Sequence, residues 1–192
     1  MHPRVYLLKI ELAEAHPAIW RQFVVPATIS LDRLHDVIQI VMGWNDSHLY
    51  EFTIGKKRYT ESPEFMEDGL EAGMYRLVDL IKQKGRTFNY VYDFGDNWQH
   101  TITILDSRYV DSERMGFIAC HDGERACPPD DVGGVYGYFD FCHALKDPLS
   151  DEHESCRHWI GDDFDPEVFK MDDVNWELMK YWRWSRDRNH SW

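Results

Sequence analysis

The most informative part of this 192-residue chain is Tyr90–His100, with the sequence Tyr-Val-Tyr-Asp-Phe-Gly-Asp-Asn-Trp-Gln-His. Aromatic side chains recur at every second position up to Phe94, which is the period of a β-strand. Gly95-Asp96-Asn97 is typical of a turn, and the alternation resumes from Trp98 onward. The stretch therefore predicts a β-hairpin that gathers two aspartates, an asparagine and a histidine around one turn. This is a site-like feature, but it does not identify a reaction.

Two strands, a helix and a third strand are expected before this hairpin. Val5–Leu12 and Ile19–Val25 alternate apolar and polar residues on either side of a short turn, which predicts an antiparallel hairpin. Apolar residues then recur at helical spacing between Ser30, a suitable N-cap, and Gly43, a suitable stop. A strand over His48–Ile54 follows. Strand, strand, helix and strand, with a later hairpin, is the element order of a β-grasp core, and residues 24–56 resemble the hairpin–helix–strand part of ubiquitin.

The remainder of the chain is expected to add helices and loops to that sheet. Residues 61–76 are polar and weakly periodic, which indicates a loop, and residues 111–136 lose regular periodicity among many Gly and Pro residues. Helices are expected at residues 77–84, 138–145 and 151–160, and a last one carries Val174, Leu178 and Trp182 on one face.

The fold class predicted from these elements is α+β, a single domain with a mostly antiparallel, β-grasp-like (ββαβ…ββ) sheet, added C-terminal helices and a long structured loop. The domain is expected to span residues 1–176, with the β-grasp-like core at about 4–106 and an acidic loop and helical addition at about 107–176. Residues 177–192 are then the end of the last helix and an aromatic and basic tail.

The charge of the chain is strongly negative and unevenly distributed. The net charge is −13, and residues 106–173 carry 18 Asp and Glu against 6 Lys and Arg. Such a surface repels phosphate backbones, so nucleic acid is an unfavourable partner, whereas cations or a basic protein partner are favoured. The simpler interpretation is a solvated acidic surface that keeps the protein soluble. No signal peptide and no apolar run of membrane-spanning length is recognised, so a cytoplasmic location with reduced cysteines is expected.

A second dense segment, Cys120–Tyr138, contains Cys-Pro-Pro-Asp-Asp and Gly-Gly, which give a loop a defined shape. Together with the hairpin it supplies the candidate functional residues: Asp93, Asp96, Asn97, His100, His35, His48, Glu124, Arg125, Cys127 and Asp130. Candidate ligands for a divalent metal are Asp96, His100, Cys120 and Cys127, with Asp93, Asp130 and Asp131 as further oxygen donors. The alternative is structural: histidines satisfied in the core, cysteines packed as small apolar residues, and acids that cap turns.

Several short motifs taken together resemble the plasmid pRiA4b ORF-3-like family. They are Ile19-Trp20-Arg21, Leu34-His35-Asp36-Val37-Ile38-Gln39, Met42-Gly43-Trp44, Tyr92–His100 and Gly123-Glu124-Arg125-Ala126-Cys127-Pro128-Pro129. The resemblance covers most of the chain, from about Val5 to Asn175. It implies no activity, because the function of the family is uncharacterised.

Three function hypotheses follow. The first is a binding or interaction module that uses an acidic and aromatic surface around the Asp93–His100 hairpin and the Cys120–Tyr138 loop. The second is a metal-dependent enzyme, of hydrolytic type, with its site at the same hairpin and loop. The third is a nucleic-acid-linked regulator, motivated by resolvase-like and repressor-like labels within the family and by the basic tail. The sequence alone does not choose among them.

Overall fold

Eight strands form one sheet in the computed structural model, which describes residues 4–110 and 118–187. The order across the sheet is β5-β4-β3-β6-β7-β1-β2-β8, and every neighbouring pair is antiparallel except β4 and β5. The strands are β1 (Val5–Leu12), β2 (Trp20–Pro26), β3 (Tyr50–Ile54), β4 (Lys57–Thr60), β5 (Gly69–Glu71), β6 (Thr87–Tyr92), β7 (Trp98–Tyr109) and β8 (Ala119–Glu124). The predicted α+β class with a mostly antiparallel sheet is confirmed.

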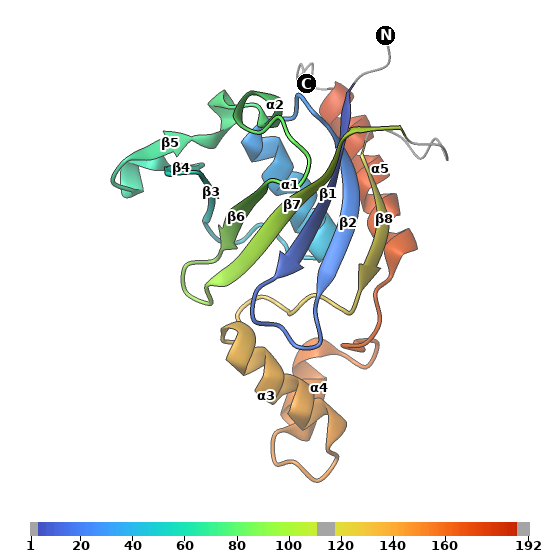
Figure 1. Cartoon of the computed structure of the whole chain (residues 1–192). Helices are drawn as coiled ribbons and strands as arrows, with labels where there is room; N and C mark the ends of the chain where they lie inside the picture. Colours follow the sequence, from blue (N-terminus) through green and yellow to red (C-terminus); the bar gives the residue numbers. More distant parts are fainter. Residues whose placement is uncertain (1–3, 111–117, 188–192) are drawn as a thin grey trace.

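Within the described residues, five α-helices complete the fold (Figure 1). They are α1 (Leu31–Met42), α2 (Leu77–Leu80), α3 (Gly134–Lys146), α4 (His153–Ile160) and α5 (Met171–Asp187), with two short 3₁₀ helices, η1 (Pro63–Phe65) and η2 (Ala72–Met74). Helix α1 lies against one face of the sheet, α5 runs beside β8, and α3 and α4 form a pair beyond one end of the sheet. None of the described helices has the length and apolar character needed to cross a membrane.

Helix α1 forms as its sequence indicates. Its apolar residues Leu34, Ile38 and Val41 are fully buried against the sheet. The helix ends at Gly43, which adopts a left-handed φ of 110° and donates its backbone N–H to the carbonyl of Gln39 at 2.8 Å. Glycine suits this position because an L side chain is strained there. This rigid end places Trp44 and the following segment beside the β6–β7 turn.

The outer edge of β8 is closed by one side chain of α5. Asn175 accepts the backbone N–H of Cys120 through Oδ1 at 2.8 Å and donates from Nδ2 to the Cys120 carbonyl at 2.9 Å. The amide side chain thus satisfies the two backbone groups that a further strand would pair with. Edge strands with unpaired backbone groups invite aggregation, so this contact protects the sheet and fixes α5.

The predicted lack of regular structure across residues 111–136 is wrong for β8, and residues 111–117 lie outside the described residues. An edge strand needs little apolar content, so its Ala-Cys-His-Asp-Gly-Glu sequence gives no strand period. The predicted loop at 61–76 also contains β5, which exists because β4 pairs with it. Helix α2 ends at Leu80, earlier than expected: Ile81 is extended and buried, and its carbonyl accepts the hydroxyl of Tyr6 at 2.8 Å.

Candidate functional site

Three chain segments meet at the end of the sheet that faces α3 and α4. They are the start of β3, the β6–β7 turn, and residues 125–133, which lead into α3. The backbone N–H of Gly133 donates to Oδ2 of Asp96 at 3.1 Å. A Cβ atom on Gly134 would lie 2.6 Å from the carbonyl oxygen of Asp96, so only glycine permits this approach. The hairpin turn and the segment that leads from Cys127 into α3 therefore contact each other.

His48, Asp93 and Asp131 converge at this junction, one from each segment. Nε2 of His48 lies 3.8 Å from Oδ2 of Asp93 and 3.4 Å from Oδ1 of Asp131. The three ligand atoms all lie within 4.8 Å of one another. Nε2 of His48 is buried but has no hydrogen-bond partner. The imidazole nitrogen faces both carboxylates but lies too far from either for a good hydrogen bond, and a cation could bridge the three groups.

Local backbone geometry positions the two carboxylates. Asp93 has a φ of 56° and Asp131 a φ of 60°, in the left-handed region that Asp tolerates better than most residues. Oδ1 of Asp93 accepts the backbone N–H of Gly95 at 2.8 Å, which leaves Oδ2 facing His48. The backbone N–H of Asp93 donates to the carbonyl of Leu49 at 2.9 Å and ties the end of β6 to the residue after His48. The sheet therefore fixes Asp93 and the backbone next to His48, whereas Asp131 comes from the exposed segment before α3.

Further carboxylates surround this group without basic partners. Asp46, Asp96 and Asp130 lie on the same three segments or on the turn that follows α1. Within the described residues, none of these acids, nor Asp93 or Asp131, forms an ion pair with Lys or Arg; only His35 and His48 contact them in this way. Oδ1 of Asp130 is buried and has no hydrogen-bond partner. So many unbalanced carboxylates leave a negative potential that a cation relieves.

Tyr92, at the end of β6, joins His48 to this acidic environment. Its ring packs edge-on against His48 at a centroid distance of 5.8 Å. Its hydroxyl oxygen accepts the backbone N–H of Ser47 at 3.1 Å. Burial, with a smaller contribution from the Asp130 carboxylate, raises the pKa of Tyr92 well above its usual value. The phenol thus stays protonated and fixes the turn before β3.

His35 and His100 do not converge with His48. Nδ1 of His35 lies 2.8 Å from the hydroxyl of Tyr90, Nε2 of His35 lies 2.7 Å from Oδ1 of Asp46, and its ring stacks on Tyr50 at 3.7 Å. Nδ1 of His100 lies 3.3 Å from the Tyr90 carbonyl, and burial lowers the pKa of His100 to about 3. Both histidines are components of the aromatic core.

The metal-ligand set Asp96, His100, Cys120 and Cys127 is not assembled. Within the described ranges, the group His48, Asp93 and Asp131 is the sole one of three or more His, Cys, Asp or Glu residues with converging ligand atoms. Asp96 is engaged with Gly133, as described above. Cys120 is buried in β8, where burial raises its pKa to about 11 and keeps it an unreactive thiol. Cys127 packs beside Gly43.

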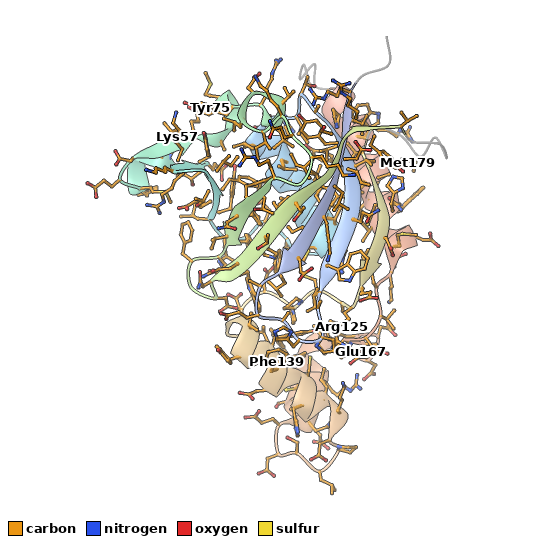
Figure 2. The ribbon with its side chains drawn as sticks, in the orientation of Figure 1. Lys57, Tyr75, Arg125, Phe139, Glu167 and Met179 are labelled. Atoms are coloured by element: carbon orange, nitrogen blue, oxygen red, sulfur yellow. The ribbon has the colours of Figure 1, made fainter. Side chains whose placement is uncertain are left out.

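The remaining candidate residues have structural partners. Oε2 of Glu124 accepts Nε1 of Trp20 at 3.0 Å, and Arg125 pairs with Glu167 on the far side of the segment (Figure 2). Asn97 occupies a left-handed turn position with a φ of 57°. From the sequence, Asp130 is a candidate functional residue and Asp131 only a further oxygen donor, whereas the structure brings Asp131 to His48. Adjacent acids in a turn point in different directions, and the sequence carries no signal for which one faces inward.

Comparison with known proteins places the chain among proteins without an assigned function. It is similar to the crystal structure of protein MM3350 from Methanosarcina mazei Go1, a protein of unknown function, with a TM-score of 0.80 and 33% identity over 91% of this chain and 99% of the other. It is 37% identical over 174 residues to the uncharacterized protein y4hQ of Sinorhizobium fredii (strain NBRC 101917 / NGR234), covering 89% of each chain. The model of the plasmid pRiA4b ORF-3-like protein family matches residues 4–173, and the chain belongs to that family.

Proposed function

We propose that the protein is a binding module that holds a divalent metal ion between His48, Asp93 and Asp131. The observation that carries the proposal is the buried Nε2 of His48, which lacks a hydrogen-bond partner and faces two carboxylates at 3.8 and 3.4 Å. Ligand atoms bound at about 2.1 Å to one ion lie about 3.0 Å apart in octahedral and about 3.4 Å apart in tetrahedral geometry. The two separations from Nε2 of His48 are close to these values, and the three ligand atoms all lie within 4.8 Å of one another.

The donor set favours a first-row transition metal. One imidazole nitrogen with two carboxylate oxygens suits Zn²⁺ or Mn²⁺, whereas Ca²⁺ and Mg²⁺ prefer sites made of oxygen alone. Asp131 is 74% exposed, so the ion would be reached from solvent. Phe94 in the hairpin turn and Tyr136 in α3 are 48% and 77% exposed at the same end of the molecule. The metal, the surrounding acids and these aromatic rings together form the surface that a partner would contact.

Metal titration of the purified chain tests this proposal. After treatment with a chelator, the protein is titrated with Zn²⁺ and, separately, Mn²⁺ by calorimetry. Asp131→Asn removes an exposed ligand without disturbing the core and should weaken binding at least tenfold, about 1.4 kcal/mol. The matched control is Asp130→Asn, which removes the same charge one residue away and should weaken binding clearly less than Asp131→Asn, because it removes only long-range attraction and no ligand. Equal weakening by both variants, or no binding at micromolar metal, would refute the site.

A second candidate function, metal-dependent hydrolysis, is supported by the number of ligands. Three protein ligands leave coordination positions open for water, and a metal-bound water becomes a nucleophile near neutral pH. The test is the metal-dependent cleavage of chromogenic esters and phosphodiesters by the intact chain. Hydrolysis that requires added metal and disappears in His48→Gln, while metal-free protein is inert, supports this reading. Metal binding without any turnover leaves the binding module as the function.

A further inference from the structure

A cationic groove lies at the opposite end of β3 and β6 from the acidic junction. Its volume is about 570 Å³, within the range of small-molecule sites of roughly 300–1,000 Å³. Two basic stretches that are distant in sequence form its walls: the β3–β4 turn with Lys57, and the segment after α2 with Lys82 and Arg86. Figure 2 labels Lys57 on the part of the molecule remote from Arg125. The strand pairing of β3 with β6 brings these stretches together.

The three basic side chains of this groove are electrostatically unsatisfied. In the part of the chain that the structure describes, Lys57, Lys82 and Arg86 form no ion pair, whereas the adjacent Arg58 is paired with Glu51 at 2.6 Å. Asp79 is the one carboxylate among the lining residues, so the groove has a formal charge of +2. The protein as a whole carries −13. A local positive charge on so acidic a protein is unusual, and its sign is opposite to that of the site at the other end of the strands.

The floor of the groove is apolar and rigid. Ile54, Tyr59 and Ile81 line it, and Tyr59 and Ile81 are buried. The carbonyl of Ile81 accepts the hydroxyl of Tyr6 at 2.8 Å, which fixes the backbone where the basic segment begins. Side chains of Lys and Arg above an apolar floor can bind an anionic group and the less polar body attached to it.

We propose that this groove binds a small molecule that carries a phosphate group. A phosphate monoester holds about −1.5 to −2 charges at neutral pH, which matches the formal +2 of the lining residues. Lys and Arg N–H groups form charge-assisted hydrogen bonds to phosphate oxygens, and the volume accommodates an attached organic group. The proposal rests on contacts separate from the metal site, so either proposal can fail alone.

The probe is inorganic pyrophosphate, titrated into the intact protein by calorimetry at constant ionic strength near 150 mM. The test variant Lys57→Gln/Lys82→Gln removes two lining charges and should weaken binding at least tenfold. The matched control Lys56→Gln/Lys84→Gln removes two exposed charges from the same turn and segment, but these residues do not line the groove. The control should change the affinity less than twofold, and thermal melts of both variants should show intact folding.

Three outcomes would overturn the proposal. Equal weakening in the two double variants would show diffuse attraction to a basic patch. Absence of pyrophosphate binding by the wild type at millimolar concentration would show that the groove does not recognise phosphate. Binding to vesicles containing phosphatidic acid without binding to pyrophosphate would assign the lysines to a lipid surface. Binding of pyrophosphate that is lost only in the lining variant supports the groove as a site.

Discussion

His100 makes the stability of this protein depend on pH, and the size of the effect follows from its burial. The side chain is 1% exposed, and burial lowers its pKa to about 3, compared with the unperturbed value of 6.5. Between these two values the unfolded chain binds a proton at this position and the folded chain does not. The free energy of unfolding therefore falls as pH falls through this window. A single group of this kind contributes about 1 kcal/mol less stability at pH 5.5 than at pH 7.5, and about 3 kcal/mol less at pH 4.5.

Urea denaturation at several pH values, on the wild type and on His100→Gln, measures this contribution. The variant loses packing and is less stable at neutral pH, but the gap between the two proteins should narrow by about 1 kcal/mol from pH 7.5 to pH 5.5. Measurements stop there because the isoelectric point is near 5.1. His143→Gln, which removes an exposed histidine of α3, is the control and should retain the wild-type slope. A gap that stays constant with pH would refute the assignment of a neutral, desolvated imidazole to His100.

Four further predictions concern packing and charge. Trp98 is fully buried, so Trp98→Ala should destabilise the fold by about 3–5 kcal/mol in a denaturant melt, and a loss below about 1 kcal/mol would contradict its place in the core. Asn175→Ala should cost about 1–3 kcal/mol and increase self-association in size-exclusion chromatography, because the edge of β8 loses its partner. Gly134→Ala should destabilise the fold more than Gly161→Ala. Both glycines have a positive φ, but only the Cβ added at Gly134 would clash with backbone atoms. Equal losses of stability in thermal melts would contradict the clash. Mixed-sequence DNA or RNA should not bind below micromolar concentration near 150 mM salt in an anisotropy titration, because the acidic surface repels phosphate backbones.

The β6–β7 hairpin, the β1–β2 hairpin and helix α1 with its stop at Gly43 are predictable from the sequence, and so are the approximate positions of α3, α4 and α5. Periodicity and turn chemistry are local properties, so the residues that form these elements also carry the signal. The excess of acidic over basic residues, which disfavours binding to nucleic acid, is likewise a property of composition. Burial of Trp98 and His100 on one face of β7 follows from strand alternation, since Trp98, His100 and Ile102 are all buried there.

Strand β8 and the convergence of distant side chains depend on tertiary structure and were not predictable from the sequence. Strand β8 has no apolar period and is recognised only through its pairing with β2. The choice of Asp131 over Asp130 as a partner of His48 depends on how the segment before α3 turns, and His48 meets Asp93 only because β3 pairs with β6. The pairing of β3 with β6 also brings Lys57 and Arg86 into the lining of one groove at the other end of these strands. Convergence of side chains is a property of packing between distant segments, and one sequence records which residues are present without recording which of them meet.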